Sequence, residues 1–272
     1  MSVINTNVSA LRAQNAMTVN ARAQSTAMEQ LSTGSKINSA KDDAAGLAIG
    51  QSMTAQVRGL NQAVRNLNDG INMMQTAEGA LVETSNMLQR MRELAVQSSN
   101  GTLSVSQRGY LQTEFSALAS QIDKISTDTK WNDQSVLSSA STFTFQAGKD
   151  SGQTVAVAIG AMNVTALGVS AALASVGTVA ASNTSIGLLD AAIGSINTQR
   201  AAIGAGINQM TYAVDNLSNV AANAAASRST IMDTDYATAS TQLSKTQIIQ
   251  QAATAMLAQA NQQPQAVLSL LK

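Results

Sequence analysis

Residues 57–74 read Val57-Arg-Gly-Leu60-Asn-Gln-Ala-Val64-Arg-Asn-Leu67-Asn-Asp-Gly-Ile71-Asn-Met-Met74, with apolar side chains alternately three and four positions apart. This is the heptad spacing of a helix that packs along one seam against other helices. The spacing continues through Ala77, Leu81, Thr84, Leu88, Met91 and Ala95. We therefore predict one long helix from Ala44 to Ser99. Asn100-Gly101-Thr102 should end it, because glycine readily takes the left-handed conformation of a helix end.

Two other segments carry the same spacing. One contains Leu111, Phe115, Leu118, Ile122, Ile125 and Thr129, and the other runs from about Ser185 to Ile231 through Leu189, Ile196, Ile203, Met210 and Leu217. Three such seams predict that helices from both halves of the chain pack together. The predicted fold class is mainly α, a long antiparallel helical coiled-coil bundle.

A short stretch between the second and third seams has the pattern of β-structure. Phe143, Phe145 and Ala147 alternate with polar residues, and Val155, Val157 and Ile159 do so again after a turn at Gly148-Lys-Asp-Ser-Gly152. This alternation predicts one β-hairpin near residues 141–160. The Ala-, Gly-, Ser- and Val-rich run that follows has no pattern that assigns it.

Both ends of the chain are compatible with helices and carry few charges. Near the N-terminus Met17, Ala21, Met28 and Leu31 share one stripe, and residues 246–271 contain no charged residue. Helices with so little charge and so much small apolar surface are marginally stable alone. We expect the two ends to pair with each other or with other copies of the chain.

The composition argues against most enzyme classes. The chain of 272 residues has 16 basic and 16 acidic residues, no His and no Cys. Histidine general bases, cysteine nucleophiles, thiolate or imidazole metal sites and disulfides are therefore excluded, and the balanced charge does not favour nucleic-acid binding. Gly204-Ala-Gly206 lacks the third glycine of a dinucleotide motif, and Asp42-Asp43 fits a helix N-terminus better than a metal or acid-base pair. We predict no catalytic residues, no metal and no cofactor.

Targeting and membrane signals are weak. The N-terminal residues have neither a basic nor an apolar region of a cleaved signal peptide, so we expect none. Residues 151–189 are uncharged, but polar residues and glycine interrupt them throughout, and we expect no membrane span.

Longer motifs at both ends resemble those of the bacterial flagellins. The most specific are Leu31-Ser-Thr-Gly-Ser-Lys-Ile-Asn-Ser-Ala-Lys-Asp-Asp-Ala-Ala-Gly46-Leu-Ala-Ile49, Gln75-Thr-Ala-Glu-Gly-Ala-Leu81, Leu88-Gln-Arg-Met-Arg-Glu-Leu-Ala-Val-Gln97, Asp233-Thr-Asp-Tyr-Ala237 and Val267-Leu-Ser-Leu-Leu271. The resemblance covers roughly residues 1–137 and 185–272. It implies a short flagellin that lacks a large variable outer domain.

For the fold, this resemblance implies a filament subunit with two layers. Residues 1–42 and 234–272 would form a terminal helical hairpin in the inner filament core. Residues 43–233 would form an outer-core helical bundle, with the β-hairpin and a short variable segment near 160–184. The terminal residues expected to drive assembly are Ile4, Leu11, Leu31, Ile248, Ile249, Leu257, Leu268, Leu270 and Leu271.

The resemblance also implies a function and partners. The chain would leave the cell by flagellar type III export, polymerise with its own copies into the extracellular filament and transmit motor torque for swimming. Other implied partners are hook-filament junction proteins, the filament cap and an export chaperone at the C-terminal region. In a host, Toll-like receptor 5 would bind Gln89, Arg90, Leu94 and Glu114, and NAIP-type receptors would bind the C-terminal segment.

Two other functions are also compatible with the sequence. A hook-filament junction protein would share the terminal hairpin, but the pure chain would not elongate indefinitely. A cell-surface protein that binds polysaccharide or a host ligand is a different class, although the sequence shows no aromatic-lined or charged cleft for it.

Overall fold

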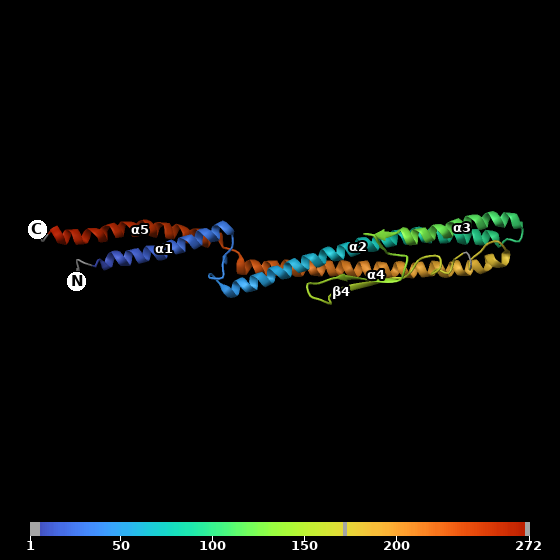
Figure 1. The fold of residues 1–272 in the computed structure, drawn as a ribbon, viewed down its shortest axis with the longest axis horizontal. Helices are drawn as coiled ribbons and strands as arrows, with labels where there is room; N and C mark the ends of the chain where they lie inside the picture. The colour runs from blue at the N-terminus through green and yellow to red at the C-terminus, as the bar shows by residue number, and fades with distance from the viewer. Residues whose placement is uncertain (1–5, 171–172, 270–272) are drawn as a thin grey trace. The chain divides into compact units, whose positions relative to one another are not determined.

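The computed structural model describes residues 6–170 and 173–269, with side chains as far as residue 262. Its helices are α1 (Val8–Thr33), α2 (Ala44–Ser98), α3 (Val105–Asp128), α4 (Val179–Met232) and α5 (Tyr236–Ser269). Its strands are β1 (Lys130–Trp131), β2 (Gln134–Ser135), β3 (Ser141–Gln146) and β4 (Thr154–Ile159). The predicted fold class, a mainly helical bundle with a small β-hairpin region, is confirmed (Figure 1).

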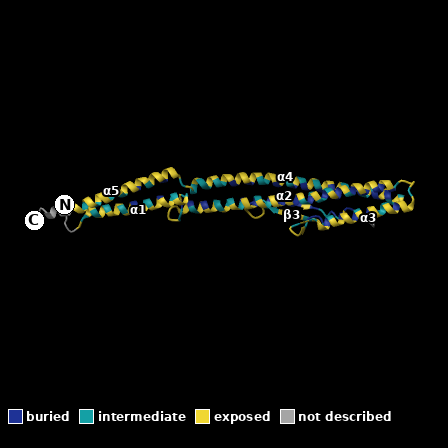
Figure 2. Ribbon diagram, turned by 90° about the horizontal axis from the view of Figure 1, so that it is seen from above, coloured by how far each residue is buried: buried dark blue, intermediate teal, exposed yellow. Residues whose placement is uncertain are grey.

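The chain divides into two compact units. Met1–Val57 and Ala222–Lys272 form one, and Arg58–Ala221 form the other. The second unit contains the predicted seams, and α2, α3 and α4 run side by side within it (Figure 1). Buried residues concentrate in this unit (Figure 2), and its largest fully buried side chains include Leu67, Leu81, Leu88, Phe115, Leu189 and Ile196. Each such side chain contributes about 1.5–3 kcal/mol through burial.

Local hydrogen bonds define where the helices begin. The Asp43 carboxylate accepts from the Gly46 main-chain N–H at 2.9 Å, so the predicted capping role of Asp43 at the start of α2 is confirmed. At the start of α3 the Ser104 and Gln107 side chains each accept from the other residue's main-chain N–H. Helix α1 ends at Gly34, whose φ of 72° is left-handed.

The end of α2 differs from the prediction in its cause. The helix stops at Ser98, close to the predicted Ser99, but Gly101 is not among the residues with positive φ. Instead, the buried Arg108 of α3 donates to the main-chain carbonyls of Ser98 and Asn100, each at 3.0 Å. A side chain of the next helix thus satisfies carbonyls that a left-handed glycine would otherwise help to satisfy.

The predicted hairpin is formed by β3 and β4, which pair antiparallel from Ser141 opposite Ile159 to Gln146 opposite Thr154. Two glycines let it lie close to the helices. A Cβ on Gly206 of α4 would lie 2.7 Å from Val157 Cγ2, and one on Gly70 of α2 would lie 2.8 Å from Phe145 Cδ1. Larger residues at these two positions would push the hairpin outward.

Three further features of the fold differ from the sequence-based prediction or were not part of it. Strands β1 and β2 form a second, very short hairpin, whose turn residues Asn132 and Asp133 both have positive φ. The unassigned run after β4 is packed rather than loose, since Met162, Leu167, Val169, Ala174 and Val176 are all buried. Helix α4 begins at Val179, inside the segment predicted to be variable and earlier than the predicted Ser185.

Candidate assembly interface

The unit made from the two ends of the chain is built on a pair of helices. Helices α1 and α5 run antiparallel and contact each other along their length (Figure 1). The side chains between them recur at three- and four-residue spacing. They are Ala10, Ala13, Met17, Asn20, Gln24, Ala27 and Leu31 on α1, and Ala239, Leu243, Thr246, Gln250, Ala253, Leu257 and Ala260 on α5. We call these residues the terminal seam.

The terminal seam corrects the predicted stripe on α1. Met17 and Leu31 belong to it, but Ala21 and Met28 are exposed, and the buried residues are Asn20 and Ala27. The prediction followed the large apolar residues, whereas close helix pairing here uses small and polar ones. The pattern that could have shown this is the spacing of alanines, Ala10, Ala13 and Ala27, in the heptad positions of the seam.

The segments next to these helices are joined by hydrogen bonds. The Lys36 main-chain N–H donates to the Met232 carbonyl at 2.7 Å, and the Thr234 N–H donates to the Gly34 carbonyl at 2.9 Å. These two bonds enclose an isolated antiparallel bridge between Ser35 and Asp233. We call this pair of bonds the connection bridge.

Large apolar side chains outside the terminal seam are 41–67% exposed in the single chain. They are Val8, Leu11, Val19 and Met28 on α1 and Tyr236, Ile248, Ile249 and Met256 on α5. Both helices accordingly show long exposed stretches (Figure 2). A concentration of such side chains on two weakly charged helices marks a surface that another protein covers.

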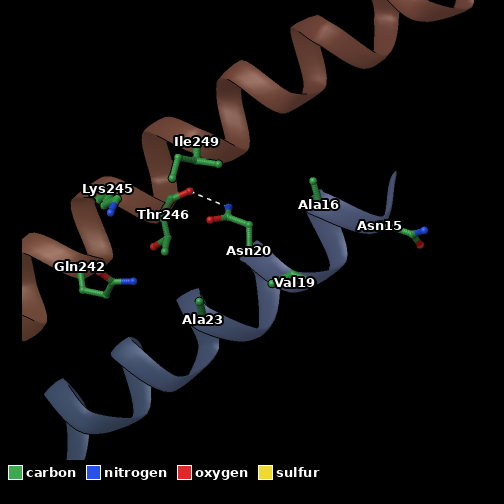
Figure 3. A pocket seen from close by; sticks show the side chains of 9 residues that line it. All are labelled: Asn15, Ala16, Val19, Asn20, Ala23, Gln242, Lys245, Thr246 and Ile249. Carbon is green, nitrogen blue, oxygen red and sulfur yellow. Dashed lines mark hydrogen bonds between the residues drawn. The ribbon is translucent and has the colours of Figure 1, made fainter. Parts of the chain in front are cut away.

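Two open grooves run along these helices. One is lined by Asn15, Ala16, Val19, Asn20, Ala23, Gln242, Lys245, Thr246 and Ile249 (Figure 3), and the other by Ser9, Arg12, Ala13, Ala16, Ile249, Ala252, Ala253 and Met256. Most of the lining residues are alanines, aliphatic side chains and amides, and each groove has one basic side chain, Lys245 in the first and Arg12 in the second. Among the residues that the structure describes, no group of three or more acidic residues could hold a metal ion.

The predicted assembly residues occupy three kinds of position. Leu11, Ile248 and Ile249 are exposed, whereas Leu31 and Leu257 lie in the terminal seam, where they face the other helix of the same chain. Ile4, Leu270 and Leu271 lie outside the described residues, and Leu268 lies in α5 beyond the last described side chain.

The predicted receptor residues lie in the other unit. Gln89, Arg90 and Glu114 are exposed on α2 and α3, and the Arg90 guanidinium pairs with Glu114 at 2.9 Å and with Glu93 at 3.0 Å. Leu94 is different, because it is 1% exposed and packs in the helical core. Three of the four side chains are therefore on the surface, and the fourth is buried in the helical core.

Helix α4 is long and apolar enough, by length and composition, to span a membrane, with a mean hydropathy of 1.2 over its most apolar window. Its buried residues pack in the helical core, and core helices of this composition pass the same test.

The start of α5 carries a titratable cap. Asp235 accepts from the Thr238 hydroxyl at 2.8 Å and from the Ala237 N–H at 2.9 Å, and these bonds, the Thr238 side chain first, lower the pKa of its carboxyl. A carboxyl whose pKa is lower in the folded state stabilises that state above its unfolded pKa, and this contribution is lost as pH falls through the folded pKa. We expect acidification from about pH 7 to about pH 3 to reduce helix content at α5.

Circular dichroism across this pH range checks the expectation. An Asp235→Asn chain, whose amide caps without titrating, should show a smaller loss of helix than the parent. Equal loss in the two chains would contradict a role of Asp235. Asp42, whose pKa is also lowered by its bonds with Ser39, still titrates in both and accounts for part of the remaining loss.

Helices that pair at the chain ends and expose apolar side chains along their outer faces define a class, that of self-assembling structural proteins. Comparison with known proteins agrees. Residues 4–142 match the bacterial flagellin N-terminal helical region, and residues 186–271 match the bacterial flagellin C-terminal helical region. The chain belongs to the bacterial flagellin family.

Similar proteins extend over the whole chain. It is 41% identical to a flagellin of Halalkalibacterium halodurans over 271 residues, covering 99% of this chain and 100% of that one. It is 41% identical to a flagellin of Bacillus subtilis over 302 residues, covering 99% of each chain. A crystal structure of Bacillus cereus flagellin superposes with a TM-score of 0.50 at 29% identity, covering 56% of this chain and 88% of that one.

This membership gives the chain its role. It is a structural subunit that is exported and polymerises with its own copies into the extracellular flagellar filament, and it is not an enzyme.

Proposed function

We propose that the filament built from this chain transmits motor torque for swimming, and that the helical ends form its inner core. In this proposal residues 1–42 and 234–272 form the inner layer and residues 43–233 the outer one. The observation that supports it is the apolar surface of α1 and α5, which no other part of the described chain covers. Burial of this surface between subunits would repeat along a polymer and offset the entropy lost on assembly.

Swimming tests the torque part of the proposal. A strain without flagellin that expresses this chain should swim, and one that expresses the chain without residues 1–40 and 235–272 should not. Filaments that form on seeds but do not restore swimming would contradict it. A chain that fails to elongate on seeds would instead indicate a hook-filament junction protein.

The same apolar surface could also bind the other partners that we propose for the chain. We propose that junction proteins and the filament cap contact the two ends of the polymer through the apolar faces of α1 and α5. An export chaperone would cover part of this surface at the C-terminal region before assembly, since exposed apolar helices are prone to aggregate. Co-purification of a chaperone with the full chain, and not with a chain truncated after residue 234, would support its place.

We further propose that released monomer is recognised by Toll-like receptor 5 through Gln89, Arg90 and Glu114, and by NAIP-type receptors through the C-terminal segment. The support for the first is a surface patch in which the Arg90 guanidinium is held by two carboxylates. Leu94 would contribute by packing beneath the patch. Substitution of Leu94 would leave a cavity, so receptor loss in such a variant would not show direct contact.

Arg90→Ala is therefore the sharper test. It should reduce receptor signalling by released monomer, whereas Arg65→Ala, which removes an exposed arginine elsewhere on α2, should not. Undiminished signalling by the Arg90 variant would contradict the proposed patch.

A further inference from the structure

The terminal seam has an unusual order of residue types. On α1 its polar members, Asn20 and Gln24, are consecutive seam positions with Ala13 and Met17 on one side and Ala27 and Leu31 on the other. On α5 the polar members, Thr246 and Gln250, are also consecutive, with Ala239 and Leu243 before them and Ala253 and Leu257 after them. Each helix thus has two consecutive polar positions in an otherwise apolar seam. We call each such pair of positions a polar step.

The two polar steps meet at Asn20. Its side chain is 7% exposed, and its amide Nδ2 donates to the Thr246 main-chain carbonyl at 2.8 Å and to Gln250 Oε1 at 3.3 Å. Figure 3 shows the Asn20 side chain directed from α1 toward Thr246. The buried amide is thus satisfied by a main-chain carbonyl and by one polar side chain of α5, that of Gln250.

A second bond ties the helices near the start of α1. Asn7 Nδ2 donates to the Ala260 main-chain carbonyl at 2.8 Å, while its Oδ1 accepts from the Ala10 N–H at 3.0 Å and caps the helix. Asn7 precedes Asn20 by about two heptads, and Ala260 follows Thr246 by about the same interval. Both bonds therefore form in the same alignment of α1 along α5, and of their acceptors only the Gln250 side chain is absent from a register shifted by one heptad.

Apolar packing alone would fix this alignment weakly. Alanine is the commonest residue of the terminal seam, so a shift of one heptad would bring similar small side chains together again. The same shift would place Asn20 beside Ala253 and Leu257, or beside Ala239 and Leu243, without the Gln250 acceptor. A buried polar side chain in a helix seam is well suited to select one register over others.

We propose that Asn20, with Asn7 as a second point, sets the register of α1 against α5. The register decides which exposed apolar residues of the two helices lie at the same level, for example Val19 and Ile249, which line one groove. This rests on the proposed inner-core role of the helices, because a shifted pair would present a different surface to the next subunit.

Cysteine cross-linking can measure the register, because the chain has no cysteine of its own. The pair Ala13→Cys with Ala253→Cys, whose positions line one groove, reports the observed register. The pair Ala13→Cys with Ala260→Cys reports a shift of one heptad. Each full-length pair is oxidised after elongation on seeds, with and without Asn20→Leu, and the cross-linked fractions are compared.

In the parent the first pair should dominate. With Asn20→Leu the ratio of observed to shifted cross-link should fall about fivefold, as loss of one hydrogen bond predicts, because the bond to Gln250 forms only in the observed register. Thr246→Ala is the matched control. It removes a buried hydroxyl that bonds only within α5, to the Leu243 carbonyl at 2.8 Å, and leaves the acceptor of Asn20, so the ratio should not change.

An unchanged ratio in Asn20→Leu would overturn the inference. If that variant does not elongate, the same ratio is measured on the unassembled chain in sulfate, which favours burial of apolar surface. There too, a lower ratio supports the inference and an unchanged ratio overturns it. If the chain without cysteine elongates but the parent cysteine pairs do not, the cysteine substitutions themselves block assembly. The pair Ala27→Cys with Ala239→Cys then replaces the first pair as the reporter of the observed register. Failure of the chain without cysteine would contradict the proposed inner-core function and not the register.

Discussion

A chain with both Ile248→Asp and Ile249→Asp is expected to remain monomeric when it is mixed with filament seeds. The two side chains are 66% and 41% exposed on α5, outside the terminal seam, so the helix pair itself does not need them. In a filament they would be covered by another subunit, and an unpaired carboxylate buried there costs several kcal/mol. Because every subunit repeats the contact, elongation should be lost rather than slowed.

Electron microscopy and sedimentation of the seeded mixture measure this loss. The matched control is Ile248→Leu with Ile249→Leu, which keeps apolar side chains of the same size and should elongate. Circular dichroism of both monomers should show equal helix content, because neither pair changes the terminal seam. Long filaments from the aspartate chain would show that this face of α5 is not covered on assembly.

The second large effect is expected in the helical core. Phe115→Ala should lower the free energy of unfolding of the unit Arg58–Ala221 by about 3–5 kcal/mol. Phe115 on α3 is 1% exposed and is among the largest fully buried side chains, so its removal leaves a cavity that the surrounding helices fill only in part.

Tyr110→Ala provides the comparison on the same helix. Tyr110 is 76% exposed, and its loss should change the unfolding free energy of the monomer by no more than about 0.5 kcal/mol. Urea denaturation followed by circular dichroism measures both variants. Equal destabilisation by the two substitutions would mean that the buried core around Phe115 does not determine the stability of this unit.

The long helices were predictable because large apolar residues mark their inner faces. Leu67, Leu81 and Leu88 are spaced as the seam requires, and all three are fully buried on α2. The β3–β4 hairpin was predictable for a similar reason, since its alternation of Val155, Val157 and Ile159 separates a buried face from an exposed one. In both cases a difference in side-chain size and polarity records which side faces the core.

Other parts were not predictable because small or distant residues determine them. The terminal seam is built from alanines and amides, which carry little hydrophobic signal, so the stripe assigned to α1 was partly wrong. The end of α2 depends on Arg108, which follows Ser98 only after a loop and belongs to another helix. Strands β1 and β2 have two residues each, too few for an alternating pattern to appear.

The sequence predicted which residues belong to the candidate site better than it predicted how those residues are oriented. The sequence identified the terminal helices and the apolar residues Leu11, Ile248 and Ile249, which are exposed. It could not separate them from Leu31 and Leu257, which face the partner helix, because that distinction depends on the rotation of each helix about its axis. The burial of Leu94 was not predicted for the same reason. The rotation of α2 places Leu94 on the buried side of the helix, together with Met91 and Ala95.

The connection bridge has a mechanical consequence. Two links of the chain run between helices here, one after α1 and one before α5, and bonds from Lys36 to Met232 and from Thr234 to Gly34 fasten them to each other. A force along Gly34–Lys36 is therefore shared with Met232–Thr234 as long as these two bonds hold, whereas residues 37–43 lie outside them. The bonded parts of the two links therefore move together as one mechanical element rather than as two independent hinges.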